Sequence, residues 1–179
     1  RQADLQFSCE WLPAPFDPEY AANVLTDLAN ADDPGLDLLK TFSEDAVGKT
    51  LLNAVAGNSP YLAQAMLKDL GFVQDLAVAG LQGSLDTVLE AIKSQQITAQ
   101  PQAEAALMAS LRVGRRRVAL VTAFADIAGV WPLARITGAL SAFADVAVDA
   151  AVGSLIAGAV QTGALTPEAA ADHGLAVLA

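Results

Sequence analysis

Cysteine and histidine are almost missing from this 179-residue chain, and their scarcity excludes several kinds of site. Cys9 has no second thiol with which to form an internal disulfide, which is compatible with a reducing cytosol. His173 cannot build a metal site from several histidines, and it is interpreted as a polar residue at a helix end rather than a catalytic group. Three aspartates are interpreted as polar positions of buried helices rather than as metal ligands: Asp126, Asp145 and Asp149.

Positive charge is also scarce, because ten Lys and Arg residues stand against twenty Asp and Glu residues, for a net charge of -10. A surface this acidic repels phosphates, which argues against nucleic acid as a partner. The longest uncharged run, 150–167, contains Ser, Gln and Thr, and it is shorter than the roughly 20 apolar residues of a membrane span. No basic segment followed by an apolar one marks a secretory signal at the N-terminus. We therefore expect a cytoplasmic protein with no membrane segment.

What the chain has in abundance is alanine and other apolar residues, 54% in all, in a pattern that predicts an all-α fold. Ser, Asp or Asn followed by Pro or an acidic residue marks helix starts, as at Asp33-Pro34, Ser43-Glu44-Asp45 and Asn58-Ser59-Pro60. Glycines mark the breaks. The expected helices before residue 100 are 19–31, one from Pro34, one from about 45 to Gly57, 61–70 closing at Gly71, and 84–96 after a break at Gly80 to Gly83.

Two long helices, Pro101 to about Val130 and Leu133 to about Gln161, are expected to form an antiparallel hairpin. Trp131-Pro132 makes the corner, since proline disfavours helix for the residue before it. In the second helix a 4-3-4-3 spacing of apolar residues predicts one buried stripe. That stripe consists of Ile136, Leu140, Phe143, Ala147 and Ala150.

The first of these helices carries four of the ten basic residues within seven positions: Arg112, Arg115, Arg116 and Arg117. Arginine donates two parallel hydrogen bonds to phosphate or carboxylate, so the cluster is a candidate contact for an anion or an acidic partner. Structural ion pairing with acids on a neighbouring helix is the favoured interpretation for most of it. Counting outward from the corner predicts that Arg115, Arg116 or Arg117 pairs with Asp145 or Asp149.

The last residues change character. Thr166-Pro167-Glu168 starts a short helix, His173-Gly174 ends it, and 175–179 is a continuous apolar run typical of a buried strand. Because a lone strand cannot satisfy its backbone groups, a further domain is expected to follow. We therefore divide the chain into a helical domain, 1–165, and the start of another domain, 166–179.

Several stretches in order resemble the N-terminal region of the bacterial glutamine synthetase adenylyltransferases, which are bifunctional adenylylating and deadenylylating enzymes. The strongest similarity lies between Gly57 and the end of the chain. The matching segments are Gly57-Asn58-Ser59-Pro60-Tyr61-Leu62, Leu111-Arg112 with Arg115-Arg116-Arg117, Ala125-Asp126-Ile127-Ala128-Gly129-Val130-Trp131, Leu140-Ser141 with Phe143-Ala144-Asp145, and His173-Gly174-Leu175-Ala176-Val177-Leu178-Ala179.

The resemblance implies transfer of AMP from ATP to a glutamine synthetase tyrosine, and its removal by phosphorolysis, under control of glutamine and the PII protein. It implies that 175–179 leads into a nucleotidyltransferase domain with a glycine-rich turn and paired aspartates that hold Mg²⁺. The chain stops before those residues, so no catalytic, cofactor-binding or metal-binding residue is assigned, and the segment is expected to be structural. A free-standing helical interaction module without enzymatic activity is the alternative.

Overall fold

A computed structural model describes residues 12–31, 34–95, 100–171 and 174, and all regular structure in these ranges is helical. The expectation of an all-α bundle is confirmed for this part of the chain. The helices are α1 (Pro18–Ala29), the 3-10 turn η2 (Pro34–Leu36), α2 (Asp37–Glu44), α3 (Ala46–Asn58), α4 (Pro60–Leu67), α5 (Leu70–Lys93), α6 (Pro101–Ile127), α7 (Leu133–Gln161) and α8 (Pro167–Ala171).

Polar side chains start the short helices where the sequence predicts it. Asp45 accepts hydrogen bonds from the Val47 and Gly48 amides at the start of α3. Ser59 accepts one from the Leu62 amide at the start of α4, with Pro60 at the first helical position. These caps satisfy amides that have no partner within their own helix. The expected cap at Asp33 lies outside the described residues.

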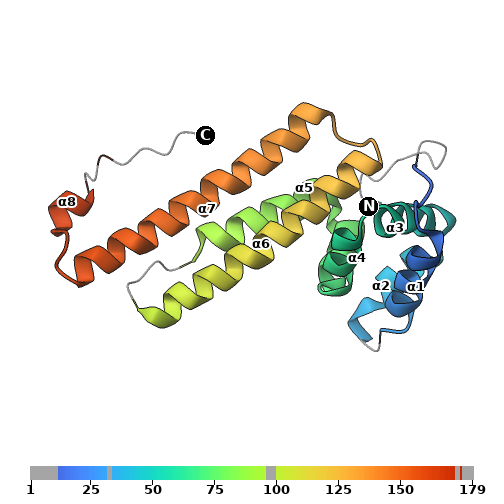
Figure 1. The fold of residues 1–179 in the computed structure, drawn as a ribbon, viewed down its shortest axis with the longest axis horizontal. Coiled ribbons are helices and arrows are strands. Elements are labelled where there is room, and N and C mark those ends of the chain that lie inside the picture. Colours follow the sequence, from blue (N-terminus) through green and yellow to red (C-terminus); the bar gives the residue numbers. More distant parts are fainter. Residues whose placement is uncertain (1–11, 32–33, 96–99, 172–173, 175–179) are drawn as a thin grey trace.

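Long helices and short ones lie in different parts of the molecule. Figure 1 shows α5, α6 and α7 extending side by side, with α1 to α4 gathered near one end of them. Both α3 and α4 pack against α6, which links the two groups. The last turns of α7 and the short α8 lie at the opposite end (Figure 1).

The corner between α6 and α7 occurs where the Trp131-Pro132 pair predicts it, although α6 ends at Ile127, three residues earlier than expected. Gly129 adopts a left-handed conformation, with φ +64, that favours glycine. The Val130 amide then donates back to the Ala125 carbonyl at 2.9 Å. Pro132 precedes α7, which packs against both α6 and α5.

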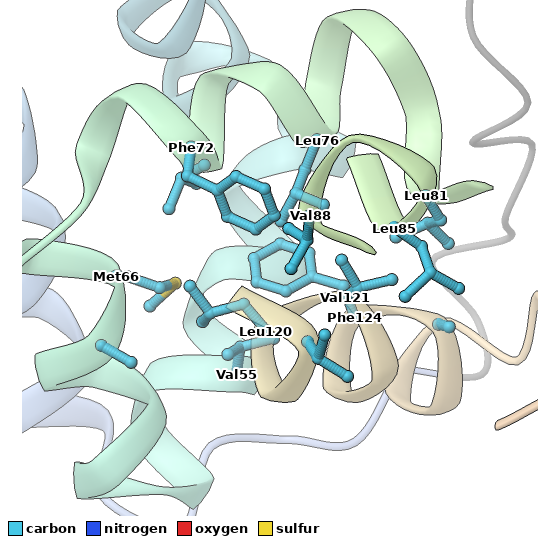
Figure 2. Close-up of a cluster of buried hydrophobic side chains, with 14 of the residues drawn as sticks. Val55, Met66, Phe72, Leu76, Leu81, Leu85, Val88, Leu120, Val121 and Phe124 are labelled. Atoms are coloured by element: carbon cyan, nitrogen blue, oxygen red, sulfur yellow. The ribbon is translucent and has the colours of Figure 1, made fainter. Parts of the chain in front are cut away.

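The hydrophobic core lies where α3, α4, α5 and α6 meet. Figure 2 shows Phe72 of α5 and Phe124 of α6 in this cluster, surrounded by aliphatic side chains from these helices. Leu120 of α6 and Met66 of α4 are fully buried in the same cluster. This core fixes the last half of α6, and with it the basic cluster, against α4 and α5.

Two sequence-based helix boundaries in the α5 region are wrong. Gly71 does not end a helix, because α4 ends at Leu67 and α5 begins at Leu70. The expected break at Gly80 is present only as a kink, since Gly80 has φ 76 and ψ 170 while helix continues on both sides. Apolar residues of α5 on both sides of the kink, among them Leu76 and Leu85, contribute to the core.

The stripe predicted for α7 is confirmed at Ile136, Phe143 and Ala150 and wrong at Leu140. Ile136, Ala139 and Ala150 are buried, and Phe143 and Val146 pack beside them, so the inner stripe alternates steps of three and four. Leu140, which was expected to be buried, is 47% exposed. By length and composition alone α7 would suffice for a membrane span, as do many core helices of soluble proteins, and little of its most apolar stretch is buried.

The chain after α7 is described only in part. Thr166 accepts a hydrogen bond from the Ala169 amide at 3.2 Å, which confirms a short capped helix at Pro167. The expected strand at 175–179 and His173 lie outside the described residues, and with them the predicted start of a further domain.

Candidate functional site

The basic cluster is divided by the fold into two inward-facing and two outward-facing side chains. Arg116 and Arg117 are partly buried and both bind the carboxylate of Asp69. Arg112 and Arg115 are exposed, and neither has an ion pair with any described residue. The four arginines therefore have different roles, although they are adjacent in sequence.

Asp69 accepts hydrogen bonds from both arginines through the same carboxylate. Arg117 donates from Nε to Oδ2 at 2.8 Å and from Nη2 to Oδ1 at 3.1 Å, a bidentate pair. Arg116 donates from Nη2 to Oδ2 at 3.1 Å. The side chain of Asp69 is 12% exposed, and those of Arg116 and Arg117 are 26% and 33% exposed. We refer to these three residues as the Asp69 cluster.

The position of Asp69 explains why its carboxylate is available. It is the residue before α5, and its carbonyl accepts from the Val73 amide at 3.1 Å. Its side chain makes no capping hydrogen bond to that helix. The carboxylate therefore bridges the start of α5 to the middle of α6, in addition to the contacts between their apolar faces.

Phe72 completes the surroundings of Arg117. The guanidinium carbon of Arg117 lies 4.8 Å from the centre of the Phe72 ring, within the range of a cation–π contact. Phe72 is itself part of the buried core. Arg117 is thus held on one side by a carboxylate and on another by an aromatic ring, which is the environment of a structural arginine.

Opposing effects act on the pKa of Asp69. Burial alone would raise the pKa of this carboxyl. The hydrogen bonds from Arg117 and Arg116, together with their positive charges, outweigh burial and hold the pKa below its ordinary value. The carboxylate is therefore ionised at neutral pH and does not suit a general base that must take up a proton there.

The predicted pairing of the cluster with Asp145 or Asp149 is wrong. Both aspartates are exposed on α7, and no ion pair joins either one to a described residue. The reason is that α6 contacts α4 and α5 as well as α7. Gly114 and Phe143 occupy the place where α6 approaches α7, so Arg116 and Arg117 face the α4–α5 junction instead. Sequence reasoning missed Asp69 for this reason.

The motif at 57–61 is also structural. Besides the cap at Ser59, the Asn58 amide donates to the Ala14 carbonyl at 3.1 Å, and its oxygen accepts from the Phe16 amide at 3.2 Å. Asn58 therefore ties the segment before α1 to the end of α3. This agrees with the sequence-based interpretation of the motif as a helix start.

Two smaller polar features remain. Arg135 lies 4.4 Å from the Trp131 ring centre and donates to Gln82 Oε1 at 2.9 Å, beside a cavity of about 140 Å³ at the α5 kink. An open hollow of about 550 Å³ lies between α1, α2 and α3, where Lys49, Glu44 and Asn53 line it. Ser43 also lines the hollow, but its hydroxyl donates to the Lys40 carbonyl at 2.8 Å, and no hydrogen bond in the described structure joins it to Glu44 or Lys49 as a base. The described residues also hold no group of three or more His, Cys, Asp or Glu side chains suited to a metal ion.

The geometry of these residues does not identify a family, but comparison with known proteins does. The sequence pattern of the family described as glutamate-ammonia ligase adenylyltransferase matches residues 49–179, which is well over half of the chain. The chain belongs to this family. The match includes the Ser59 cap, Asp69 and all four arginines of the basic cluster.

Individual relatives agree with that assignment. The chain is similar to proteins named bifunctional glutamine synthetase adenylyltransferase/adenylyl-removing enzyme. It is 42% identical over 86 residues to one from Xanthobacter autotrophicus, covering 46% of this chain and 9% of the relative. It is 32% identical over 152 residues to one from Rhizobium meliloti, covering 82% and 15%. It is 30% identical over 174 residues to one from a Bradyrhizobium species, covering 95% and 16%.

These relatives are much longer than this chain. The chain spans less than a fifth of the length of each of them. No solved structure matches the chain significantly.

Proposed function

We propose that this chain is the N-terminal helical segment of an enzyme that transfers AMP from ATP to a tyrosine of glutamine synthetase and removes it again by phosphorolysis. Family membership carries the proposal, because the names of the relatives state both activities. The segment would place the catalytic domains of the longer protein and would take no chemical part itself.

The use of the charged residues supports a structural role. Asp69 forms the least exposed ion pairs among the described residues, and its partners are Arg116 and Arg117. Their function is to join α6 to the α4–α5 junction. The helices α6 and α7 would then form a long arm that extends from the group of α1 to α4.

ATP and Mg²⁺ belong to the proposed function of the longer protein. The side chains described here do not fit a magnesium site, because they form no group of three acidic, histidine or cysteine residues. We therefore assign no step of AMP transfer to this segment. Its proposed partners are glutamine synthetase, the regulator PII and the catalytic domain of its own polypeptide.

The proposed setting is the cytoplasm, away from nucleic acid and membranes. The net charge of -10 disfavours binding to phosphate backbones. In α7, Asp145 and Asp149 occupy the middle of the helix, where a membrane-spanning helix would bury their charge at high cost. The inner stripe of α7 packs on α5 and α6, as expected of a soluble bundle.

A paired activity assay tests the proposal. Adenylylated glutamine synthetase, inorganic phosphate and Mg²⁺ would be incubated with the 179-residue chain and, separately, with the full product of its open reading frame. We expect ADP release with the full product and none with the chain alone. ADP release by the chain alone would contradict the structural role, whereas no ADP release by the full product would contradict the enzymatic one.

A further inference from the structure

Besides the inner stripe that packs on the bundle, α7 has a second apolar stripe. Its residues recur at steps of three and four, and we call them the outer seam: Leu133, Thr137, Leu140, Ala144, Val148, Ala151 and Leu155. At 3.6 residues per turn they fall within an arc of about 80° and extend over about 33 Å of the helix. The helix is therefore apolar on two faces, and the second is largely exposed.

The outer seam is the most exposed apolar surface on the long helices. Leu133 is 74% exposed and Leu155 is 72% exposed, while Leu140 between them is 47% exposed. Thr137 and Ala144 are exposed as well, and Val148 and Ala151 are half-buried. Single exposed apolar residues are common, but a continuous row of them along one helix is typical of an interaction surface.

A third face of α7 is acidic. Asp145 and Asp149 are one turn apart, and they project about 120° from both the inner stripe and the outer seam. Both are exposed and neither has an ion pair within the described ranges. A surface that covers the seam would therefore gain from basic residues along the edge nearest to these carboxylates.

We propose that the outer seam is the docking surface for another part of the same polypeptide, one that presents an apolar strip bordered by Lys or Arg. This inference rests on the proposed function, because it takes the chain as a segment of a longer enzyme. The relatives support that occupant, since more than four fifths of their length lies outside the region matched by this chain. A domain held on α7 would be rigidly connected to the group of α1 to α4 through α5 and α6.

Two other occupants fit the chemistry less well. A second copy of the chain would bring two surfaces together that each carry Asp145 and Asp149, in a chain with a net charge of -10. A lipid bilayer would have to surround the same two carboxylates in the middle of the helix. A basic-edged segment of the same polypeptide satisfies both the apolar seam and the acidic face.

Thiol labelling measures whether the seam is covered. Leu140→Cys and Leu155→Cys would be introduced separately into the 179-residue chain and into the full product of its open reading frame. The rate of maleimide labelling at each site would be measured by mass spectrometry under native conditions. Leu38→Cys on α2 is the matched control, because Leu38 is also a half-exposed leucine and α2 does not pack against α7.

We expect both seam cysteines to react about tenfold more slowly in the full product than in the chain, because a packed interface excludes the reagent with the water. The control cysteine should react at the same rate in both. Equal rates at both seam positions in the full product would overturn the docking surface.

Two further measurements on the 179-residue chain test whether a second copy or a lipid bilayer covers the seam instead. A dimer in light scattering that Leu155→Asp dissociates and Leu38→Asp does not would overturn the proposal in favour of a second copy. Flotation with vesicles of phosphatidylcholine and phosphatidylglycerol that Leu155→Asp abolishes would overturn it in favour of a membrane.

The labelling experiment and the activity assay can fail independently of each other. A full product that removes AMP from glutamine synthetase but leaves both seam cysteines reactive would refute the docking surface alone. A full product without that activity, in which the seam is protected, would refute the proposed function alone.

Discussion

The helices α3 and α7 have similarly apolar sequences, but they are buried to very different degrees. In α3, seven of 13 residues are buried, among them Leu51, Leu52 and Val55. In α7, three of 29 residues are buried. The difference arises from position, because α3 is packed by α1, α2, α4 and α6, while α7 extends beyond the bundle with α5 and α6 on one side. Apolar composition alone therefore does not show which helix belongs to the core.

The basic cluster repeats this contrast on a smaller scale. Arg116 and Arg117 serve the packed end of the molecule through Asp69, whereas Arg112, one turn earlier on α6, projects into solvent. The packed region uses its charges internally, and the extended region leaves both charges and apolar side chains uncovered. The extended region is thus the one suited to contacts beyond this segment.

The largest expected effect compares two leucines, one in each region. Leu120→Ala empties a fully buried site in the core (Figure 2) and should lower the free energy of unfolding by about 2–5 kcal/mol. Leu155→Ala removes a side chain that is 72% exposed and should change it by less than about 0.5 kcal/mol. Urea denaturation of the 179-residue chain measures both. Similar losses for the two variants would show that α7 is packed in solution.

The next effect concerns the Asp69 cluster. Asp69→Asn leaves two partly buried arginines without a charged acceptor and should lower the free energy of unfolding by about 1.5–3 kcal/mol. A double-mutant cycle of Asp69→Ala with Arg117→Ala should show a clear favourable coupling. The same cycle with Arg112→Ala is the control, and it should show coupling near zero, since Arg112 is exposed and has no ion pair in the described structure. Equal couplings would contradict the division of the cluster.

The lowered pKa of Asp69 gives this pair a defined dependence on pH. A group whose pKa is depressed in the folded state stabilises the fold above its unfolded pKa of about 3.9, and that stabilisation is lost as the pH falls through the folded value. The difference in unfolding free energy between wild type and Asp69→Asn should therefore be constant near neutral pH and shrink below about pH 4. A difference that grows on acidification would reverse the sign of the inferred shift.

Local signals predicted most of the helices, because each signal acts within a few residues of its cause. Asp45 and Ser59 cap the helices expected to follow them, and the corner before Pro132 is in place. The phase of α7 could not be predicted in the same way. Because α7 has alanine at so many positions, a buried stripe that includes Leu140 and one that includes Ala139 fit helical periodicity equally well. The packing of the neighbouring helices decides which of the two is buried.

The partner of the arginines was unpredictable for a related reason. Counting from the corner considered α6 and α7 alone, whereas Asp69 is 47 residues from Arg116 in sequence and lies at the junction of α4 and α5. Such a contact follows from the tertiary arrangement of α4, α5 and α6. The resemblance to the family did not depend on this contact, because it rested on the order and spacing of short segments along the chain.

A pair of glycines tests how closely the long helices approach. A Cβ at Gly114 would lie 2.8 Å from Ile92 Cδ1 and 3.0 Å from Phe143 Cε2. Gly114→Ala should therefore destabilise the chain by about 1 kcal/mol, because the steric cost exceeds the gain in helix propensity. Gly138→Ala on α7, where nothing lies within 4 Å, should stabilise it by about 0.5–1 kcal/mol. Thermal or urea unfolding distinguishes the signs, and a gain at both positions would show that α5, α6 and α7 are loosely packed.

The smallest expected effect belongs to the two outward-facing arginines. Arg112→Ala and Arg115→Ala should each change the free energy of unfolding by less than about 0.5 kcal/mol, because their side chains are exposed and make no ion pair with the described residues. The matched change Arg117→Ala removes the bidentate pair with Asp69 and the contact with Phe72, so it should cost clearly more. All three proteins can be compared by urea denaturation in the same buffer. A loss above about 1 kcal/mol at Arg112 or Arg115 would show that these side chains also hold the fold together, and it would remove them as candidates for contact with an anion or an acidic partner.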